Sequence, residues 1–284
     1  MRTQKSTLRQ VADTLLSLIC LPLLAVAQSN STSAEAANPK ELPPTQSDNA
    51  SVQLIKNYLT VTGGQEVHQG LSNVVAEGTI KESTLQRHFN LIETADGKRH
   101  LTYYWTHLGR KHRVLYVYDG LQAWMQVLEP KKQEAKSYGG PDGTHFAHQH
   151  WLLQPFTLPR RADYVFIYQG SSKVSGRPAH IIQGYGKRGI HSWFYFDKEK
   201  FLLTRWGGEG QIAGALEPMD YRATEFKSVA GVLLPSKIDL LIENAAFGHI
   251  QFKEIKLNQN LNNLSFLMPS STIPTLRQRP TVEN

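Results

Sequence analysis

The stretch NVVAEGTIKES (residues 73–83) decides the fold, because two sets of residues alternate along it with a period of two. This is the period of a β-strand, whose successive side chains point to opposite faces of a sheet. One set comprises Val74, Ala76, Gly78 and Ile80, and the other comprises Val75, Glu77, Thr79 and Lys81. The stretch therefore predicts a strand that begins at about residue 73.

Four more strand-like stretches follow, and short turns separate them. ADGKR (residues 95–99) is a good hairpin connection, and Asp119-Gly120 marks another turn. Parallel strands would need crossover helices, so five closely spaced strands predict an antiparallel meander. The four stretches are RHFNLIE (87–93), RHLTYYWTHL (99–108), KHRVLYVYDG (111–120) and LQAWMQVLE (121–129).

The strand pattern stops between residues 139 and 161, where THFAHQHWLLQPFTLPRR (144–161) has helical spacing. Another helix is predicted near the start, with Ser51 as its N-cap and Gly63-Gly64 as its end. Strands resume afterwards, and a glycine-rich loop is expected at residues 207–214. The later predicted strands are 163–170, 177–186, 191–200, 201–206, 219–231, 232–244 and 248–258.

These elements predict a mainly β (α+β) protein with about 11 strands. So many consecutive antiparallel strands must close, split or be covered by other elements. Helices are predicted where the meander is interrupted. We therefore expect an incomplete antiparallel β-barrel, or strongly curved sheet, with helices that cover its concave face.

The N-terminus has the layout of a secretory signal peptide. A basic region is followed by a 13-residue apolar run, which is too short to span a bilayer and ends in Ala25-Val26-Ala27. We predict cleavage after Ala27 and export to a periplasm. Residues 28–50 are then expected to form a disordered leader, residues 51–269 one domain, and residues 270–284 a flexible tail.

Composition limits the chemistry of the mature chain. Cys20 is the only cysteine and lies in the signal, so no disulfide, thiolate nucleophile or cysteine-based zinc site is expected. Processing leaves 28 basic and 23 acidic residues, a net charge of +5 that is spread along the chain. Without a basic helix or binding motif, nucleic acid is not an expected partner. Transient contact with an anionic membrane surface is compatible with this charge.

Four blocks, taken in order, resemble the LolA-like family of exported bacterial proteins similar to outer-membrane lipoprotein-sorting proteins. The resemblance covers residues 51–269, including the opening stretch 55–74 and the closing stretch 262–269. It implies an incomplete barrel plugged by helices, and a carrier of acyl chains or another hydrophobic ligand. Relatives with this fold also act as envelope-stress sensors. The blocks are YVYDGLQAWMQV (116–127), VSGRPAHIIQG (174–184), SWFYFDKEKFLLTR (192–205) and DYRATEFKSVAGVLLPSKIDL (220–240).

Large apolar side chains on the predicted strands and the His-rich helix are candidates for a hydrophobic cavity and its lid. Each of them could equally be ordinary core. The candidates are Tyr103, Trp105, Tyr116, Met125, Phe146, Trp151, Phe166, Trp193 and Tyr195.

His145, His148 and His150 raise the question of a metal site. Two imidazoles on one helix face can bind zinc or copper, but a tight site needs three or four ligands. No cysteine and no carboxylate within the helix completes the set; Asp142 and a histidine from another helix could, but nothing in the sequence requires it. We therefore expect an amphipathic lid, with Phe146, Trp151 and Leu152 inward and the histidines near its polar edge. Protonation of the histidines could loosen such a lid.

No catalytic motif is found, so we expect no enzyme, no catalytic residue and no cofactor. Gly-x-Ser-x-Gly is absent, and Gly207-Gly208-Glu209-Gly210 lacks the Lys-Ser/Thr of a phosphate-binding loop. Scattered acidic residues leave an acid/base pair open. The sequence predicts a monomeric periplasmic binding or carrier protein for a lipid or lipoprotein acyl chain. An envelope sensing module with a protein partner, or a His-dependent metalloprotein, are the alternatives.

Overall fold

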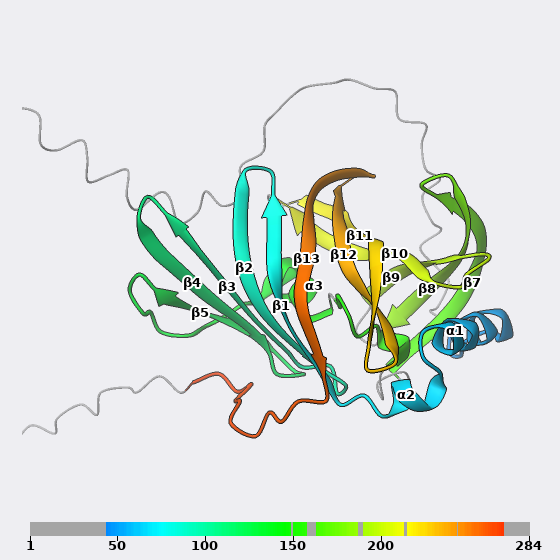
Figure 1. The fold of residues 1–284 in the computed structure, drawn as a ribbon, viewed down its shortest axis with the longest axis horizontal. Coiled ribbons are helices and arrows are strands. Elements are labelled where there is room, and N and C mark those ends of the chain that lie inside the picture. The colour runs from blue at the N-terminus through cyan, green and yellow to red at the C-terminus, as the bar shows by residue number, and fades with distance from the viewer. Residues whose placement is uncertain are drawn as a thin grey trace, which may run out of the picture.

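The computed structural model describes residues 44–148, 150–157, 163–186, 190–212, 215–242 and 244–269. Within these ranges thirteen strands form one antiparallel sheet in the order β6-β5-β4-β3-β2-β1-β13-β12-β11-β10-β9-β8-β7, and Figure 1 shows its strong curvature. The strands are β1 (Asn73–Glu82), β2 (Leu85–Thr94), β3 (Arg99–His107), β4 (Arg110–Tyr118), β5 (Ala123–Glu129), β6 (Lys136–Ser137), β7 (Tyr164–Val174), β8 (Arg177–Gly186), β9 (Ile190–Asp197), β10 (Leu203–Ile212), β11 (Ala215–Val229), β12 (Val232–Ile242) and β13 (Ala245–Leu257).

The sheet is open, since β6 and β7 stand at its two ends and do not pair with each other. The predicted fold class, a mainly β protein with a large curved antiparallel sheet, is therefore confirmed. Two details of the strands differ from the prediction. The short strand β6 was not expected, and Gly207 and Gly208 belong to β10, where they pair with Asp220 and Met219, rather than to a loop. Glycine has no side chain to show a period of two, so the sequence pattern could not reveal this part of β10.

The chain builds the sheet from the middle outward and then from the far edge back to the middle. Strands β1 to β6 lie in sequence order on one side, and strands β7 to β13 lie in sequence order on the other. The two halves meet where β1 pairs with β13. Between β6 and β7 the chain crosses from one edge to the other. This crossing contains helix α3 (Gly140–His148) and the 3-10 helix η1 (Pro155–Thr157), and Figure 1 shows α3 behind the central strands.

Helix α1 (Asn49–Val61) lies beside edge strand β7, and the short helix α2 (Gln65–Gln69) follows and contacts α1. The N-cap of α1 is Asp48, not the predicted Ser51: Asp48 Oδ1 accepts the Ser51 N–H at 2.7 Å. The other carboxylate oxygen of Asp48 accepts the Tyr168 N–H at 2.6 Å, and Ser51 Oγ donates to the Phe166 carbonyl at 2.6 Å. These bonds satisfy backbone groups of β7 that would otherwise be open to another strand. The folded part thus begins before residue 51.

One face of the sheet, here called the inner face, packs against the crossing and forms the core. Its side chains alternate with those of the outer face along each strand. Gly78 lies at a β-bulge on this face, where an added Cβ would lie 2.1 Å from the Gln251 carbonyl oxygen. Buried inner-face residues include Val74, Ile80, Phe89, Leu91, Leu101, Ile182, Phe194, Phe196, Trp206, Leu234, Ile238, Ile250 and Phe252.

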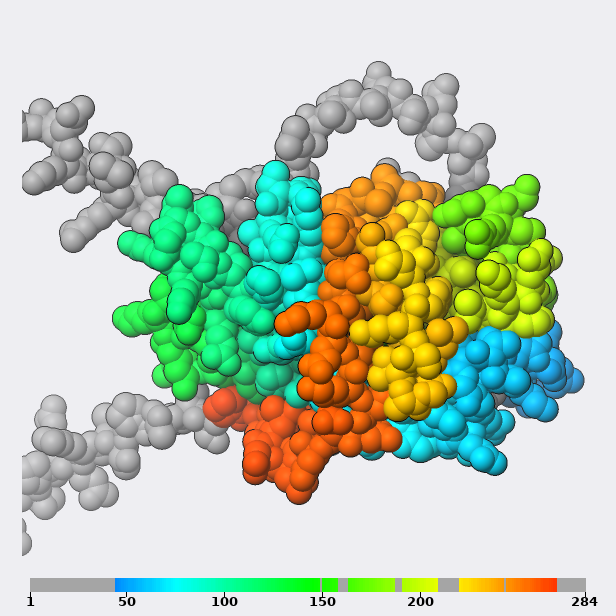
Figure 2. Space-filling view, in the orientation of Figure 1, coloured from blue at the N-terminus to red at the C-terminus, as the bar shows by residue number. Residues whose placement is uncertain are grey.

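The outer face of β3–β5 is partly covered by residues 258–269. Trp124 Nε1 donates to the Phe266 carbonyl at 2.9 Å, and the rings of His100 and Phe266 lie 6.4 Å apart. Figure 2 shows this segment below the strands of the first half of the sheet. In the described ranges, no helix has both the length and the apolarity needed to cross a bilayer. The predicted signal peptide, residues 28–43 of the leader and the predicted tail lie outside these ranges.

Candidate ligand-binding face

The crossing between β6 and β7 packs on the inner face of the sheet. We call residues 140–148 and 150–157 the plug. Three of its aromatic side chains, spaced five residues apart, contact different parts of the structure. Phe146 lies 5.9 Å from the Tyr116 ring, Trp151 lies 5.4 Å from Phe89, and Phe156 lies 5.2 Å from Phe194. The plug therefore joins the two halves of a sheet whose edges do not meet.

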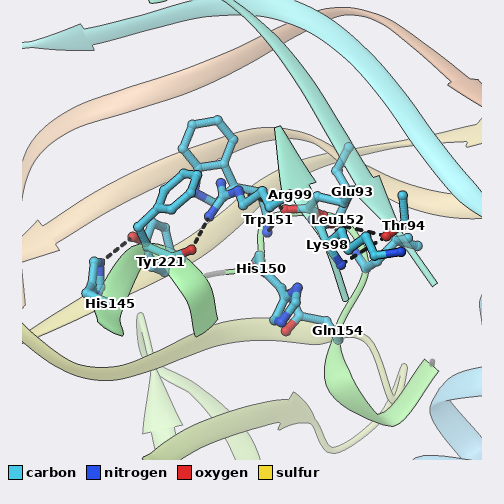
Figure 3. A network of polar contacts seen from close by, with 12 residues as sticks. Glu93, Thr94, Lys98, Arg99, His145, His150, Trp151, Leu152, Gln154 and Tyr221 are labelled. Carbon is cyan, nitrogen blue, oxygen red and sulfur yellow. Dashed lines mark hydrogen bonds and ion pairs between the residues drawn. The ribbon is translucent and has the colours of Figure 1, made fainter. Parts of the chain in front are cut away.

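A buried carboxylate holds the middle of the plug (Figure 3). Glu93 accepts three consecutive backbone N–H groups, from Trp151, Leu152 and Leu153, at 2.9, 3.0 and 2.9 Å. Arg99 stands directly opposite Glu93 in the β2–β3 register, and its Nε lies 3.6 Å from Glu93 Oε1. Both side chains are only 1% exposed. The carboxylate thus satisfies three donors that would otherwise be buried without an acceptor.

The arginine of this pair also contacts the plug. Its guanidinium lies 5.1 Å from the Phe146 ring and 4.7 Å from the Trp151 ring, and Nη1 donates to the Phe146 carbonyl at 3.4 Å. Aromatic faces stabilise a desolvated cation. Glu93 and Arg99 were not identified from the sequence. Their positions on either side of the predicted ADGKR turn could have indicated a cross-strand pair, but nothing in the sequence indicates that the pair is buried.

His150 does not lie at the polar edge of a lid, whereas His145 and His148 are half-buried. Helix α3 ends at His148, and the residues that follow enter the core, so His150 is only 6% exposed. Its carbonyl accepts the Trp206 Nε1–H at 2.9 Å. His145 Nε2 lies 3.4 Å from the Tyr221 hydroxyl, and burial raises the pKa of that tyrosine. The predicted lid is therefore a packed part of the core. Among the described residues, no group of three or more His, Cys, Asp or Glu side chains is arranged to hold a metal ion.

Four of the nine predicted site residues come together on the inner face of β3, β4 and β5. The registers Tyr103–Val114–Val127 and Leu101–Tyr116–Met125 place these side chains in two neighbouring rows, and Trp105 follows Tyr103 along β3. All of them except Leu101 are half-buried. We call this surface the apolar strip. It consists of Tyr103, Trp105, Val114, Tyr116, Met125 and Val127.

Polar groups fix the aromatic side chains of the apolar strip. The Arg87 guanidinium lies 4.6 Å from the Tyr103 ring and forms an ion pair with Glu82. Trp105 stacks on His112 at 5.0 Å with an interplanar angle of 12°. Burial raises the pKa of Tyr103, so its hydroxyl stays protonated at neutral pH. The strip is thus an apolar surface with neutral hydrogen-bonding groups, and the plug residue Phe146 borders it next to Tyr116.

The other predicted site residues lie elsewhere. Phe146 and Trp151 belong to the plug, and Phe166 is buried beneath the start of α1. Trp193 and Tyr195 lie on the outer face, since they alternate with the buried Phe194 and Phe196 along β9. Trp193 is 38% exposed, and the Arg205 guanidinium lies 5.2 Å from the Tyr195 ring. The structure therefore does not bring Trp193 or Tyr195 together with the apolar strip.

Comparisons with known proteins give similarity at the level of the fold. No family model matches the sequence, and no curated protein matches it. The chain is similar to the solved structure of a putative outer membrane lipoprotein-sorting protein domain from Vibrio parahaemolyticus, with 10% identity, a TM-score of 0.49, and coverage of 73% of this chain and 94% of that one. The chain is also similar to a LolA superfamily protein from Nitrosomonas europaea, with 10% identity, a TM-score of 0.48, and coverage of 75% of this chain and 95% of that one.

A DUF1329 family protein from Desulfovibrio piger is similar at 12% identity, with a TM-score of 0.45 and coverage of 75% of this chain and 94% of that one. At these identities the likeness concerns the fold alone.

Proposed function

We propose that this chain is an exported, periplasmic binding or carrier protein that holds the acyl chain of a lipid or lipidated protein against the apolar strip. Binding is reversible and involves no covalent chemistry. One observation carries the proposal: six apolar side chains lie side by side on one face, and each is half-buried, so that part of its surface remains accessible. Contiguous exposed apolar surface on a soluble protein marks a binding site more often than chance.

The energetics of the strip suit reversible binding. Each methylene removed from water contributes about 0.8 kcal/mol, so eight methylenes contribute roughly 6 kcal/mol before the costs of association. Rows of aromatic rings and one methionine form an adaptable surface that does not demand one chain shape. The expected affinity is therefore moderate, as a carrier that must release its ligand requires.

The plug sets the inner limit of the site. Phe146 contacts Tyr116 at the border of the strip, while Glu93 holds residues 151–153 in the core. An acyl chain longer than the strip must either extend out of the molecule or displace the plug, which breaks the three bonds to Glu93. We infer that the strip binds first and that plug displacement is the costly step.

The test uses a fluorescent fatty acid and paired variants. Trp105→Ala/Met125→Ala removes apolar area from the strip, and Trp193→Ala removes an aromatic side chain of similar exposure from the outer face. We expect the double variant to weaken binding by at least about ten-fold, or 1.4 kcal/mol. The Trp193→Ala variant should bind like the unmodified chain. Failure of the unmodified chain to bind, or an equal loss in both variants, contradicts the proposal.

Export is tested separately from binding. The N-terminal sequence of the protein recovered from the periplasm of an exporting host should begin at Gln28, since the layout of residues 1–27 favours cleavage after Ala27. Recovery in the cytoplasmic fraction with an intact Met1 contradicts this part of the proposal and leaves ligand binding to be judged by the variants above.

A further inference from the structure

We propose that the ligand of the apolar strip is an anionic amphiphile, with its acyl chain on the strip and its carboxylate or phosphate group at the turn between β3 and β4. This inference rests on the proposed function and adds the charge class of the ligand and the direction in which it lies. It is carried by a change in side-chain chemistry along two paired strands.

The register of β3 and β4 is unbroken over nine residue pairs, so every second pair faces the inner side. From the plug toward the turn, three inner pairs are Leu101–Tyr116, Tyr103–Val114 and Trp105–His112, and the last is His107–Arg110. The apolar strip therefore ends in two histidines and an arginine within one hairpin. Leu108 and Gly109 form the turn, both with positive φ.

Arg110 is the arginine at this end of the apolar strip. Arg110 and His107 are exposed, and no carboxylate among the described residues lies within 4.0 Å of Arg110. Further exposed cations stand on the same end of the sheet, at Lys111, Lys131 and Lys132. Positive charge therefore collects where the apolar strip meets water.

Three acidic side chains lie near this end, namely Glu82, Glu129 and the exposed Glu134, which follows the two lysines. Glu82 forms its ion pair with Arg87, whose guanidinium packs on the Tyr103 ring. Glu129 stands opposite Arg113 in the β4–β5 register. None of the three forms an ion pair with Arg110, and the exposed cations outnumber the unpaired carboxylates, so the charge left over for a ligand is positive.

An anionic headgroup complements this arrangement better than a neutral or cationic one. Guanidinium donates two parallel hydrogen bonds to a carboxylate or phosphate, and such charge-assisted bonds are stronger than neutral ones. The head end of an amphiphile would stay partly in water near Arg110, while its chain lies along Trp105, Tyr103 and Tyr116. Exposed charges interact weakly when isolated, so we expect a selectivity of about ten-fold rather than an absolute requirement.

The experiment compares four probes with the same twelve-carbon chain, each below its micelle-forming concentration: dodecanoate, dodecyl phosphate, dodecanol and dodecyltrimethylammonium. Affinity is measured by displacement of a neutral fluorescent acyl probe from the full exported chain, at low and high salt. Inorganic phosphate serves as a headgroup without a chain. The variant is His107→Gln/Arg110→Gln, and Arg177→Gln removes one exposed positive charge at the opposite end of the sheet as a control.

We expect both anionic probes to bind about ten-fold more tightly than dodecanol at low salt, and the cationic probe to bind most weakly. The double variant and high salt should each reduce the anionic preference to less than three-fold, while Arg177→Gln keeps it. Equal affinities for all four probes overturn the headgroup assignment and leave acyl-chain binding intact. Binding of none of them overturns the proposed function itself. Displacement by inorganic phosphate alone contradicts an amphiphile as the ligand.

Discussion

Replacement of Glu93 by glutamine should destabilise the fold by about 4 kcal/mol. The side chain keeps its size but loses its charge and one of its two acceptor oxygens. In the native protein Oε1 accepts the Trp151 N–H, and Oε2 accepts those of Leu152 and Leu153. In either orientation, the new NH₂ group points at an N–H that needs an acceptor.

Two contributions give the magnitude. A buried donor left unsatisfied costs about 1–3 kcal/mol. Loss of the carboxylate that compensates the buried charge of Arg99, at 3.6 Å, costs about 3–5 kcal/mol. The two overlap, because both arise from the same desolvated group, so about 4 kcal/mol is expected in total. This is a large part of the roughly 5–15 kcal/mol by which proteins are stable.

The assay is urea unfolding followed by tryptophan fluorescence, since Trp151 and Trp206 are buried. With a slope of about 2–3 kcal/mol per molar urea, the midpoint should fall by roughly 1.5 M. Glu254→Gln is the matched control: its ion pair with Lys256 is half exposed, so the cost should stay below about 1 kcal/mol. A loss below 1 kcal/mol for Glu93→Gln refutes the role assigned to this carboxylate.

Three further changes test other parts of the structure. Burial lowers the pKa of His100 to about 4, so the unfolded chain binds a proton at a higher pH than the folded chain does. The free energy of unfolding should therefore drop by at most about 3 kcal/mol as pH falls from 6.5 to 4. In urea titrations at several pH values, His100→Gln should reduce this pH dependence. Asp48→Ala should cost about 1–2 kcal/mol, because it removes the N-cap of α1 and the acceptor of an edge N–H of β7; thermal unfolding measures it, and no loss would show that the edge is held otherwise. Gly78→Ala should cost more than about 3 kcal/mol, since the new methyl would meet backbone on the neighbouring strand, and a variant as stable as the parent in urea would contradict the bulge geometry.

The strands could be predicted from the sequence where one face of the sheet is buried and the other is exposed to solvent. In NVVAEGTIKES the alternation locates β1 within one residue of its observed end. Gly207 and Gly208 were assigned to a loop because strand alternation cannot be read from residues without side chains. The start of α1 was placed three residues late, because Asp48 and Ser51 are both residue types that cap helices. The second bond of Asp48, from the Tyr168 N–H, comes from a strand more than a hundred residues away.

The candidate site could be predicted only in part. Tyr103, Trp105, Tyr116 and Met125, which the sequence predicts as ligand-binding, do share one face, and their pairing follows from hairpins that the turns define. Which face of β9 is inward could not be read from SWFYFD, because four consecutive aromatic residues place a large ring on both faces. As a result Trp193 and Tyr195 were assigned to the wrong side of the sheet.

The Glu93–Arg99 pair that holds the plug could not be predicted from the sequence, for a different reason. A glutamate and an arginine on either side of a turn suggest an exposed pair at the end of a hairpin. Their burial depends on residues 151–153, which belong to the crossing between β6 and β7 and pack onto the pair from outside the hairpin.

The pairing of β1 with β13 also governs the order in which the molecule can assemble. Residue 74 lies opposite residue 257, so the central seam requires almost the whole folded chain to be present. Loops this long close slowly, because their ends must be found by chain diffusion. During synthesis the N-terminal strands appear first, so the side of β1 that will pair with β13 stays unpaired until β13 has been made. A nascent chain in that state is open to strand addition from its neighbours, and loss of residues 245–257 would leave it so permanently.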